Sequence, residues 1–142
     1  MLGESGRGGA TVSKHAILTE HRGLDALFAE ARAALESRRA GVARAALEGL
    51  AAALAVHFEQ EDGLYYPPVA SLRPADAERV RGFAAAHVRF LAQLADVERR
   101  AREVSLAEAR RAFETFALDF AAHEGAEEEL LRSMEAEVHE AC

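Results

Sequence analysis

The 142-residue chain is long enough for one domain of ordinary size, and half of its residues are hydrophobic, so it can bury a sizeable core. Its 24 acidic and 17 basic residues give a formal net charge of −7, which argues against nucleic acid and an anionic membrane surface as partners. A single cysteine, Cys142, excludes an internal disulfide framework, and no uncharged apolar run reaches the about 18 residues of a membrane span. The N-terminus lacks the apolar core of a signal peptide, so a cytoplasmic location is expected.

Four long helices are predicted after a glycine-rich tail over residues 1–12, which is expected to be flexible. In chain order, the helices cover residues 13–38, 42–64, 74–103 and 105–140. Ser13 is the predicted N-cap of the first helix, and Gly41 is the predicted break before the second. Pro74 suits the first turn of the third helix, and Ser105 opens a capping box at the start of the fourth.

Each helix carries an apolar seam whose members are three or four residues apart, and the connections between the helices are short. This pattern predicts an all-α fold, an antiparallel up-down-up-down four-helix bundle, for the domain over residues 13–142. The seam of the second helix ends at Leu64. Polar residues interrupt the seams, one histidine on each helix and two glutamates. They are His21, His57, Glu61, His87, His123 and Glu127.

The four seam histidines are predicted to lie at one depth of the bundle. Measured from the turns that join the first helix to the second and the third to the fourth, they lie roughly 22 to 27 Å along their helices, at about 1.5 Å per residue. Glu61 follows His57, and Glu127 follows His123, by four residues on the same helix face. Both His-x-x-x-Glu pairs therefore project into the layer formed by the histidines.

This polar layer predicts a metal centre. Two carboxylates that face each other in an apolar core are very costly unless cations compensate them. Six nitrogen and oxygen ligands are too many for one tetrahedral zinc ion. They suit two metal ions that are bridged by the two carboxylates and carry two terminal imidazoles each. This mixture of ligands favours iron, with manganese or zinc as substitutes.

The order of these residues resembles the hemerythrin-like (HHE cation-binding) family over about residues 13–140. The residues that carry the resemblance are His21, then His57 to Asp62 with Tyr66 and Pro67, then His87, then His123 to Glu127. The resemblance implies a four-helix bundle around a non-haem di-iron centre, oxo- or hydroxo-bridged, that binds O2 or related small ligands such as NO or peroxide. It implies that His21 and His57 serve one iron and His87 and His123 the other, bridged by Glu61 and Glu127.

One position departs from the oxygen-carrying members of that family. They have a second histidine four residues after the one on the third helix, where this chain has Leu91. Loss of that ligand opens a coordination position or admits water or another side chain, which favours sensing, scavenging or storage over simple O2 carriage. Tyr65, four residues past Glu61 on the same face, is a candidate second-shell hydrogen-bond donor or replacement ligand.

Two alternatives remain open at this point. Open iron positions would also support an oxidoreductase that turns over peroxide or NO. A metal-stabilised helical module without chemistry of its own could instead act as a monomer or homodimer that docks an unidentified protein partner. The sequence does not decide whether the chain is an enzyme.

The remaining titratable residues are expected at the surface. His15 lies six residues before His21, about 120° away around the helix, and His139 lies in the last turn of the fourth helix. Phe90 and Phe120 are expected to keep water from the metals. Four acidic residues beside the predicted ligands are expected to form solvated faces. They are Glu59, Asp62, Glu124 and Glu128.

Overall fold

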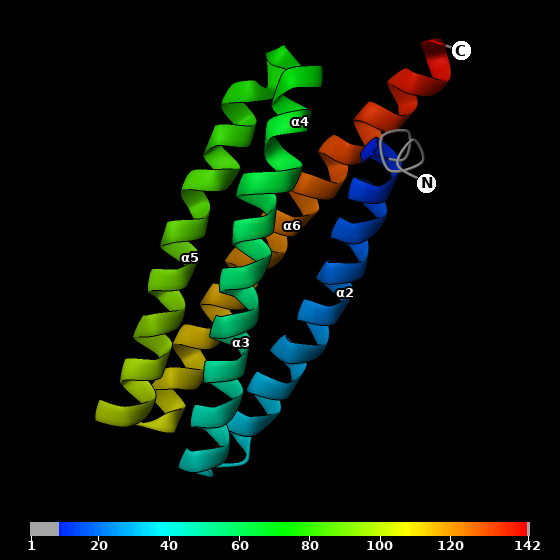
Figure 1. The fold of residues 1–142 in the computed structure, drawn as a ribbon. Helices are drawn as coiled ribbons and strands as arrows, with labels where there is room; N and C mark the ends of the chain where they lie inside the picture. Colours follow the sequence, from blue (N-terminus) through cyan, green and yellow to red (C-terminus); the bar gives the residue numbers. More distant parts are fainter. Residues whose placement is uncertain (1–8, 142) are drawn as a thin grey trace.

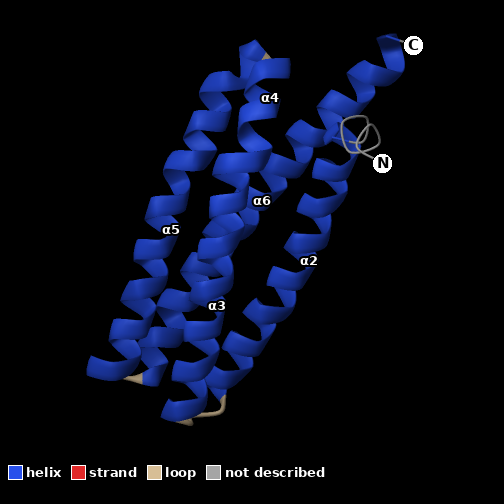
Figure 2. Cartoon of the chain, in the orientation of Figure 1, coloured by secondary structure: helices blue, strands red, loops and turns tan. Residues whose placement is uncertain are grey.

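The computed structural model of the chain describes residues 9–141, and within that range it contains helices and no strand (Figure 2). The burial of side chains is described from residue 18 to residue 134. Some predictions fall outside these described parts. They concern residues 1–8 of the tail and the side chains of His15, His139 and Cys142.

Four long helices lie side by side (Figure 1). They are α2 (Gly9–Glu36), α3 (Ala40–Gln60), α5 (Ala77–Glu103) and α6 (Leu106–Ala141). Helix α2 packs against α3 and α6, and α5 packs against the same two helices, so the four helices close a ring around one core. The all-α prediction is confirmed, and the arrangement is that of a four-helix bundle.

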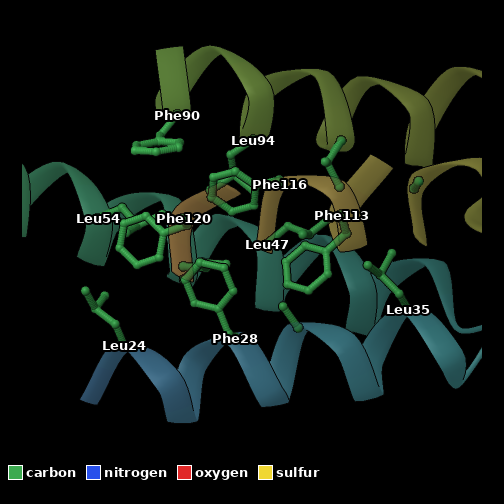
Figure 3. Packing of buried hydrophobic residues seen from close by; sticks show 14 of the residues in the cluster. Leu24, Phe28, Leu35, Leu47, Leu54, Phe90, Leu94, Phe113, Phe116 and Phe120 are labelled. Atoms are coloured by element: carbon green, nitrogen blue, oxygen red, sulfur yellow. The ribbon is translucent and has the colours of Figure 1, made fainter. Parts of the chain in front are cut away.

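Two clusters of buried hydrophobic side chains fill the bundle. The larger cluster (Figure 3) includes Phe28, Phe58, Phe90, Phe113, Phe116 and Phe120. The smaller cluster consists of Tyr66, Val69, Val80, Phe83 and Leu130. On α5 and α6 the histidine lies between residues of the two clusters along the chain, so the histidine layer separates the larger cluster from the smaller one. The polar layer is therefore closed on both sides by apolar packing, and the larger cluster supplies most of the hydrophobic stabilisation.

Helix α3 continues past its predicted end at Leu64. It passes into a π-helical segment, η1 (Glu61–Tyr65), and then into a short helix, α4 (Tyr66–Leu72). Pro67 and Pro68 lie in the first turn of α4, the part of a helix in which proline is best tolerated. Leu64 is 64% exposed, contrary to its predicted place on the seam, because the wider π-helical turn rotates the side chains outward.

The starts of the helices agree only in part with the predictions. Helix α2 begins at Gly9, so Ser13 lies inside the helix and not at its N-cap. A single 3₁₀ turn, η2 (Pro74–Asp76), precedes α5. The Oγ atom of Ser105 accepts a hydrogen bond from the backbone N–H of Glu108 at 3.0 Å, which confirms the predicted N-cap of α6.

The stretch Ala40–Leu72 is long and apolar enough to cross a membrane by length and composition alone, with a mean hydropathy of 1.3. This is a weak indication, because the core helix of a bundle passes the same test. A third of its apolar window is buried against the rest of the bundle. The expectation that no segment spans a bilayer stays a prediction.

The turn between α2 and α3 contains a left-handed residue at Arg38, which has φ of 62°. Gly41, the predicted break, lies instead in the first turn of α3 and has a negative φ. A residue with a Cβ atom pays about 1 kcal/mol for the left-handed conformation, and glycine avoids that cost. The chain therefore stores a small strain at the position that follows the end of α2.

We expect Arg38→Gly to raise the free energy of unfolding by about 0.5 to 1 kcal/mol, measured by urea denaturation of the metal-free chain. The control is Arg38→Ala, which removes the same exposed side chain but keeps the Cβ atom and should bring no gain. An equal gain in both variants would show that the side chain, and not the backbone conformation, is responsible.

Candidate metal centre

The four long helices each bring one seam histidine into the same layer of the core. His21 comes from α2, His57 from α3, His87 from α5 and His123 from α6, and none is more than 8% exposed. The ring centroids of His21 and His57 are 5.4 Å apart, and those of His87 and His123 are 5.2 Å apart. The structure thus brings the four rings together in two pairs, as their equal depths predict.

Glu61 and Glu127 lie among the rings, and each carboxylate faces one histidine from each pair. The distances from Oε1 to Nε2 are 3.3 Å for Glu61 and His57, 3.1 Å for Glu61 and His87, 3.2 Å for Glu127 and His123, and 3.8 Å for Glu127 and His21. Glu61 is fully buried, and Glu127 is 4% exposed. Both carboxylates are therefore held in the centre of the bundle, away from solvent.

Many of these facing atoms have no hydrogen-bond partner. The unpaired atoms are Nε2 of His21, His57 and His123, both oxygens of Glu61 and Oε1 of Glu127. Buried polar atoms in folded proteins are nearly always paired, so several unpaired atoms in one layer require an explanation. Cations between the imidazole nitrogens and the carboxylate oxygens would satisfy them together. The residues present therefore fit a metal centre.

The candidate ligands form two groups that share Glu61. One group contains His21, His57 and Glu61, and the other contains Glu61, His87 and His123. Within each group, the atoms that could bind a metal lie within 4.8 Å of one another. Glu61 is therefore the residue common to both groups of candidate ligands.

The outer ring nitrogens are also held, by carboxylates on neighbouring helices. The Nδ1 atoms lie 2.8 Å from Glu128 for His21, 2.9 Å from Glu20 for His57 and 3.0 Å from Asp62 for His87. A carboxylate accepts a hydrogen bond from the ring N–H, which fixes the tautomer and turns Nε2 toward the centre. Three of the four rings therefore have the second hydrogen bond that metal-binding histidines usually make.

These carboxylates correct part of the sequence prediction. Asp62 and Glu128 were expected to form solvated faces. Asp62 is exposed as predicted and Glu128 is half-buried, and each side chain also holds a histidine ring. Glu59 is exposed as predicted. Glu20 was missed in the sequence analysis. Its carboxylate contacts His57 on α3, whereas the adjacent His21 is contacted by Glu128 on α6. No spacing within a single helix reports such pairings.

A buried tyrosine completes the layer. The hydroxyl of Tyr66 donates a hydrogen bond to Oε2 of Glu127 at 2.8 Å and lies 3.1 Å from Nε2 of His87. The sequence prediction named the neighbouring Tyr65, whose side chain is only half-buried. The backbone N–H of Tyr66 bonds to the carbonyl of Glu61, five residues earlier, so the fifth residue after Glu61, and not the fourth, faces the layer.

The comparison with known families agrees with this geometry. The profile of the hemerythrin HHE cation binding domain matches residues 13–140. The chain belongs to this family. The match spans the four long helices and contains all six candidate ligands. Searches among curated proteins and among solved structures found no match.

In the metal-free form of this hemerythrin HHE domain, the two buried carboxylates have pKa values that are shifted in opposite directions. Burial opposes the charge on Glu61, but its contacts with His57 and His87 outweigh burial and hold the pKa of this carboxyl below its usual range. Burial, followed by the neighbouring Glu61, raises the pKa of Glu127 to about 11. Burial and the neighbouring His87 lower the pKa of His123 to about 4, so this imidazole is neutral at pH 7, as a metal ligand must be.

Glu124 of the hemerythrin HHE domain is buried, contrary to its predicted place on a solvated face. It is 8% exposed, and its Oε2 atom lies 3.6 Å from Nδ1 of His21 without a hydrogen-bond partner. Burial, followed by the charge of Asp25, raises the pKa of Glu124 to about 8. The carboxyl therefore lies beside the candidate ligands, although its spacing along α6 places it one residue outside the seam.

Aromatic rings close the layer on the side of the larger hydrophobic cluster. The ring centroids of Phe90 and Phe120 lie 5.1 and 6.2 Å from that of His123, so both rings pack beside the layer, and their role in excluding water stays a prediction. Sequence reasoning missed Phe58, which stacks on His87 with ring centroids 4.0 Å apart. The stacking holds the His87 ring in one orientation, together with the hydrogen bond to its Nδ1 atom.

Proposed function

We propose that the chain is a non-haem di-iron protein that binds O2, or the related small ligands NO and peroxide, for sensing, scavenging or storage. The position of Glu61 carries this proposal. The carboxylate is fully buried, both of its oxygens are unpaired, and it belongs to both groups of candidate ligands. A single ion would leave one pair of imidazoles without a cation, whereas two ions bridged by Glu61 use both pairs.

The proposed ligand set follows the two groups. His21 and His57 bind one ion, His87 and His123 bind the other, and Glu61 and Glu127 bridge them. Imidazole and carboxylate ligands also suit manganese and zinc, and iron is proposed because the family resemblance implies a di-iron centre. When bound, the ions supply coordination positions and redox chemistry for the small ligand.

The side chains around the centre orient the ligands and exclude water. The carboxylates of Glu20, Asp62 and Glu128 hold the outer nitrogens of three rings, so that Nε2 of each ring faces the centre. The stacked ring of Phe58 and its neighbours keep bulk water from the side of the larger cluster. A dry surrounding strengthens the interaction between the ions and their carboxylates.

A small apolar cleft supports a diatomic ligand. Its volume is about 20 Å³. It is lined by the five residues of the smaller hydrophobic cluster and, in addition, by Tyr65, Glu127 and Leu131. This space holds roughly one water-sized molecule. The apolar lining favours a small uncharged ligand over a charged one, because a charge would lose its hydration there.

We also propose that the four long helices follow one another in antiparallel up-down-up-down order. The connections Ser37–Arg39 and Val104–Ser105 are too short to cross the length of the bundle. In Figure 1 the colours run from one end of the bundle to the other and back along successive helices. The ring of neighbouring helices agrees with this order.

We expect the chain, loaded anaerobically with ferrous iron, to retain about two irons per chain after desalting and to change its visible absorption when it is aerated. Metal analysis and absorption spectroscopy on the same samples check this. The His87→Ala variant is the control and should lose iron and the absorption change together. Fewer than about one iron per chain, with no change on aeration, would overturn the proposal.

The same samples separate binding from turnover. Consumption of peroxide or NO by the loaded chain, faster than by free iron and reduced in His87→Ala, would make the protein an oxidoreductase. Reversible binding without consumption would favour sensing or storage.

A further inference from the structure

We propose that Tyr66 is a ligand of the metal ion held by His87 and His123. This inference rests on the proposed metal centre and concerns one protein ligand within it. Leu91 leaves a coordination position of that ion without a histidine, and the phenol oxygen of Tyr66 takes a position on the same ion. The observations that carry the inference are distances, hydrogen-bond pairing and the shape of the π-helical segment.

The distances around the Tyr66 hydroxyl are those between neighbouring ligands of one ion. Two ligands at right angles, each about 2.1 Å from a metal, lie about 3.0 Å apart. The Tyr66 oxygen lies 2.8 Å from Oε2 of Glu127 and 3.1 Å from Nε2 of His87. The separation of Nε2 of His87 from Oε1 of Glu61, 3.1 Å, has the same value. The hydroxyl therefore lies where a further ligand beside these atoms would lie.

The hydrogen bonds around Tyr66 and His87 hold the phenol oxygen beside the inner nitrogen of the His87 ring. The Nδ1 atom of His87 lies 3.0 Å from Asp62, which turns Nε2 of the same ring toward the centre. The hydroxyl proton of Tyr66 is donated to Glu127. The phenol oxygen and Nε2 of His87 thus lie 3.1 Å apart in a buried site. A cation bound by both atoms would replace the hydrogen bonds of the hydroxyl, and the phenol proton would leave to solvent as the metal–oxygen bond forms.

The backbone supports the placement of this side chain. The π-helical turn η1 gives up regular α-helical hydrogen bonds, and such turns often occur at functional sites. Its effect is to bring Tyr66, and not Tyr65, into the layer, where Tyr66 is 7% exposed and its ring stacks against that of His87 at 5.5 Å. Pro67 follows directly and lies in the first turn of α4, so the helix restarts at the tyrosine.

Leu91 cannot supply the missing ligand and does not block the hydroxyl. It is half-buried and packs against the larger hydrophobic cluster, whereas Tyr66 belongs to the smaller cluster on the other side of the layer. The two residues thus approach the centre from opposite sides. The third helix therefore has no nitrogen ligand at position 91, and the segment after Glu61 offers an oxygen ligand on the other side of the layer.

The test uses the full chain loaded with ferric iron, with Tyr66→Phe and Tyr65→Phe as matched variants. A phenolate bound to ferric iron gives a visible charge-transfer absorption and resonance-enhanced vibrations of the tyrosine ring. We expect both signals in the unchanged chain and in Tyr65→Phe, and the loss of both in Tyr66→Phe at unchanged iron content. Metal analysis of each sample fixes the iron content independently of the spectra.

The outcomes distinguish this inference from the proposed function. A chain that holds two irons but shows no tyrosinate vibrations overturns the assignment of Tyr66 and leaves the di-iron centre standing. Signals that persist in Tyr66→Phe and disappear in Tyr65→Phe also overturn it, in favour of the neighbouring residue. A chain that takes up no iron overturns the di-iron proposal and this assignment with it. If Tyr66→Phe fails to fold, Tyr65→Phe decides the question, because Tyr66 is then its one remaining tyrosine: retained signals support the assignment and lost signals overturn it.

Discussion

Replacement of Glu61 by glutamine is expected to remove both metal ions, with a loss of affinity of at least about 100-fold. Glu61 is the one residue that belongs to both groups of candidate ligands, and its two oxygens are fully buried and unpaired. Glutamine has nearly the same volume, but its neutral amide replaces a charged oxygen that would bridge the two cations. The measurement is the iron content after desalting against a graded series of chelator concentrations.

Glu59→Gln is the matched control for this experiment. It makes the same change of charge two residues earlier on the same helix, at an exposed position, and should leave the iron content unchanged. Far-ultraviolet circular dichroism of the metal-free variants checks that both still fold. Full retention of two irons by Glu61→Gln, or the loss of only one, would show that Glu61 is not the bridge.

The histidine layer could be predicted because it depends on counting along nearly straight helices. A rise of about 1.5 Å per residue converts the positions of His21, His57, His87 and His123 into equal depths. The i, i+4 spacing then adds Glu127 to the same layer without knowledge of the neighbouring helices. These inferences hold wherever a helix remains regular between its end and the residue concerned.

The segment after Glu61 could not be predicted in the same way. Counting in steps of 3.6 residues places Leu64 and Tyr65 toward the core, but the π-helical turn places Leu64 outward and Tyr66 inward. Local propensity does not signal such a turn. Its cost must be offset by packing, here the burial of Tyr66 against Phe83 and His87. The shift therefore depends on tertiary contacts that a single sequence does not display.

The outer carboxylates illustrate a second limit. Whether an acidic side chain beside a seam reaches a histidine depends on the rotation of the neighbouring helix. Glu20 and Glu128 reach rings on other helices, whereas Glu59, with the same chemistry and a similar place beside the seam, remains in solvent. Glu124 is buried for the same reason, because α2 covers that face of α6. The hydrophobic pattern of one helix fixes its inner face but not the edges of that face.

Metal removal is expected to destabilise the chain more at about pH 8 than at about pH 6.5, because the metal-free layer depends on a bound proton. The folded-state pKa of Glu127, about 11, lies far above its unfolded value of 4.5. A raised pKa contributes stability that is complete below pH 4.5 and is lost as the pH rises toward 11. Glu124, whose pKa is raised to about 8, also contributes stability that is lost as the pH rises. The same holds for His57: burial opposes its charge, but its contacts with Glu61 and Glu20 raise its pKa.

The contribution of His123 to stability depends on pH in the opposite direction, but it does not change between about pH 6.5 and pH 8. Its pKa is lowered to about 4 from 6.5, so its contribution is complete above pH 6.5 and is lost only below it. Between about pH 6.5 and pH 8, the metal-free chain should therefore lose up to about 2 kcal/mol of stability for each proton concerned, at about 1.4 kcal/mol per pH unit. The metal-loaded chain should not lose this stability, because the cations hold the same ligands deprotonated and bind more tightly as the pH rises.

Melting temperatures of the loaded and the chelator-treated chain, measured at both pH values, test this expectation. The difference between the two forms should widen by roughly 5 to 10 °C as the pH rises. Glu127→Gln is the matched variant, because a neutral amide fills the same space without a proton to lose, and its metal-free form should depend less on pH. A melting temperature of the metal-free chain that stays constant or rises between the two pH values would mean that Glu127 does not hold a proton there. In that case charged histidines alone would compensate the two carboxylates, and the layer would be electrostatically balanced without metal ions.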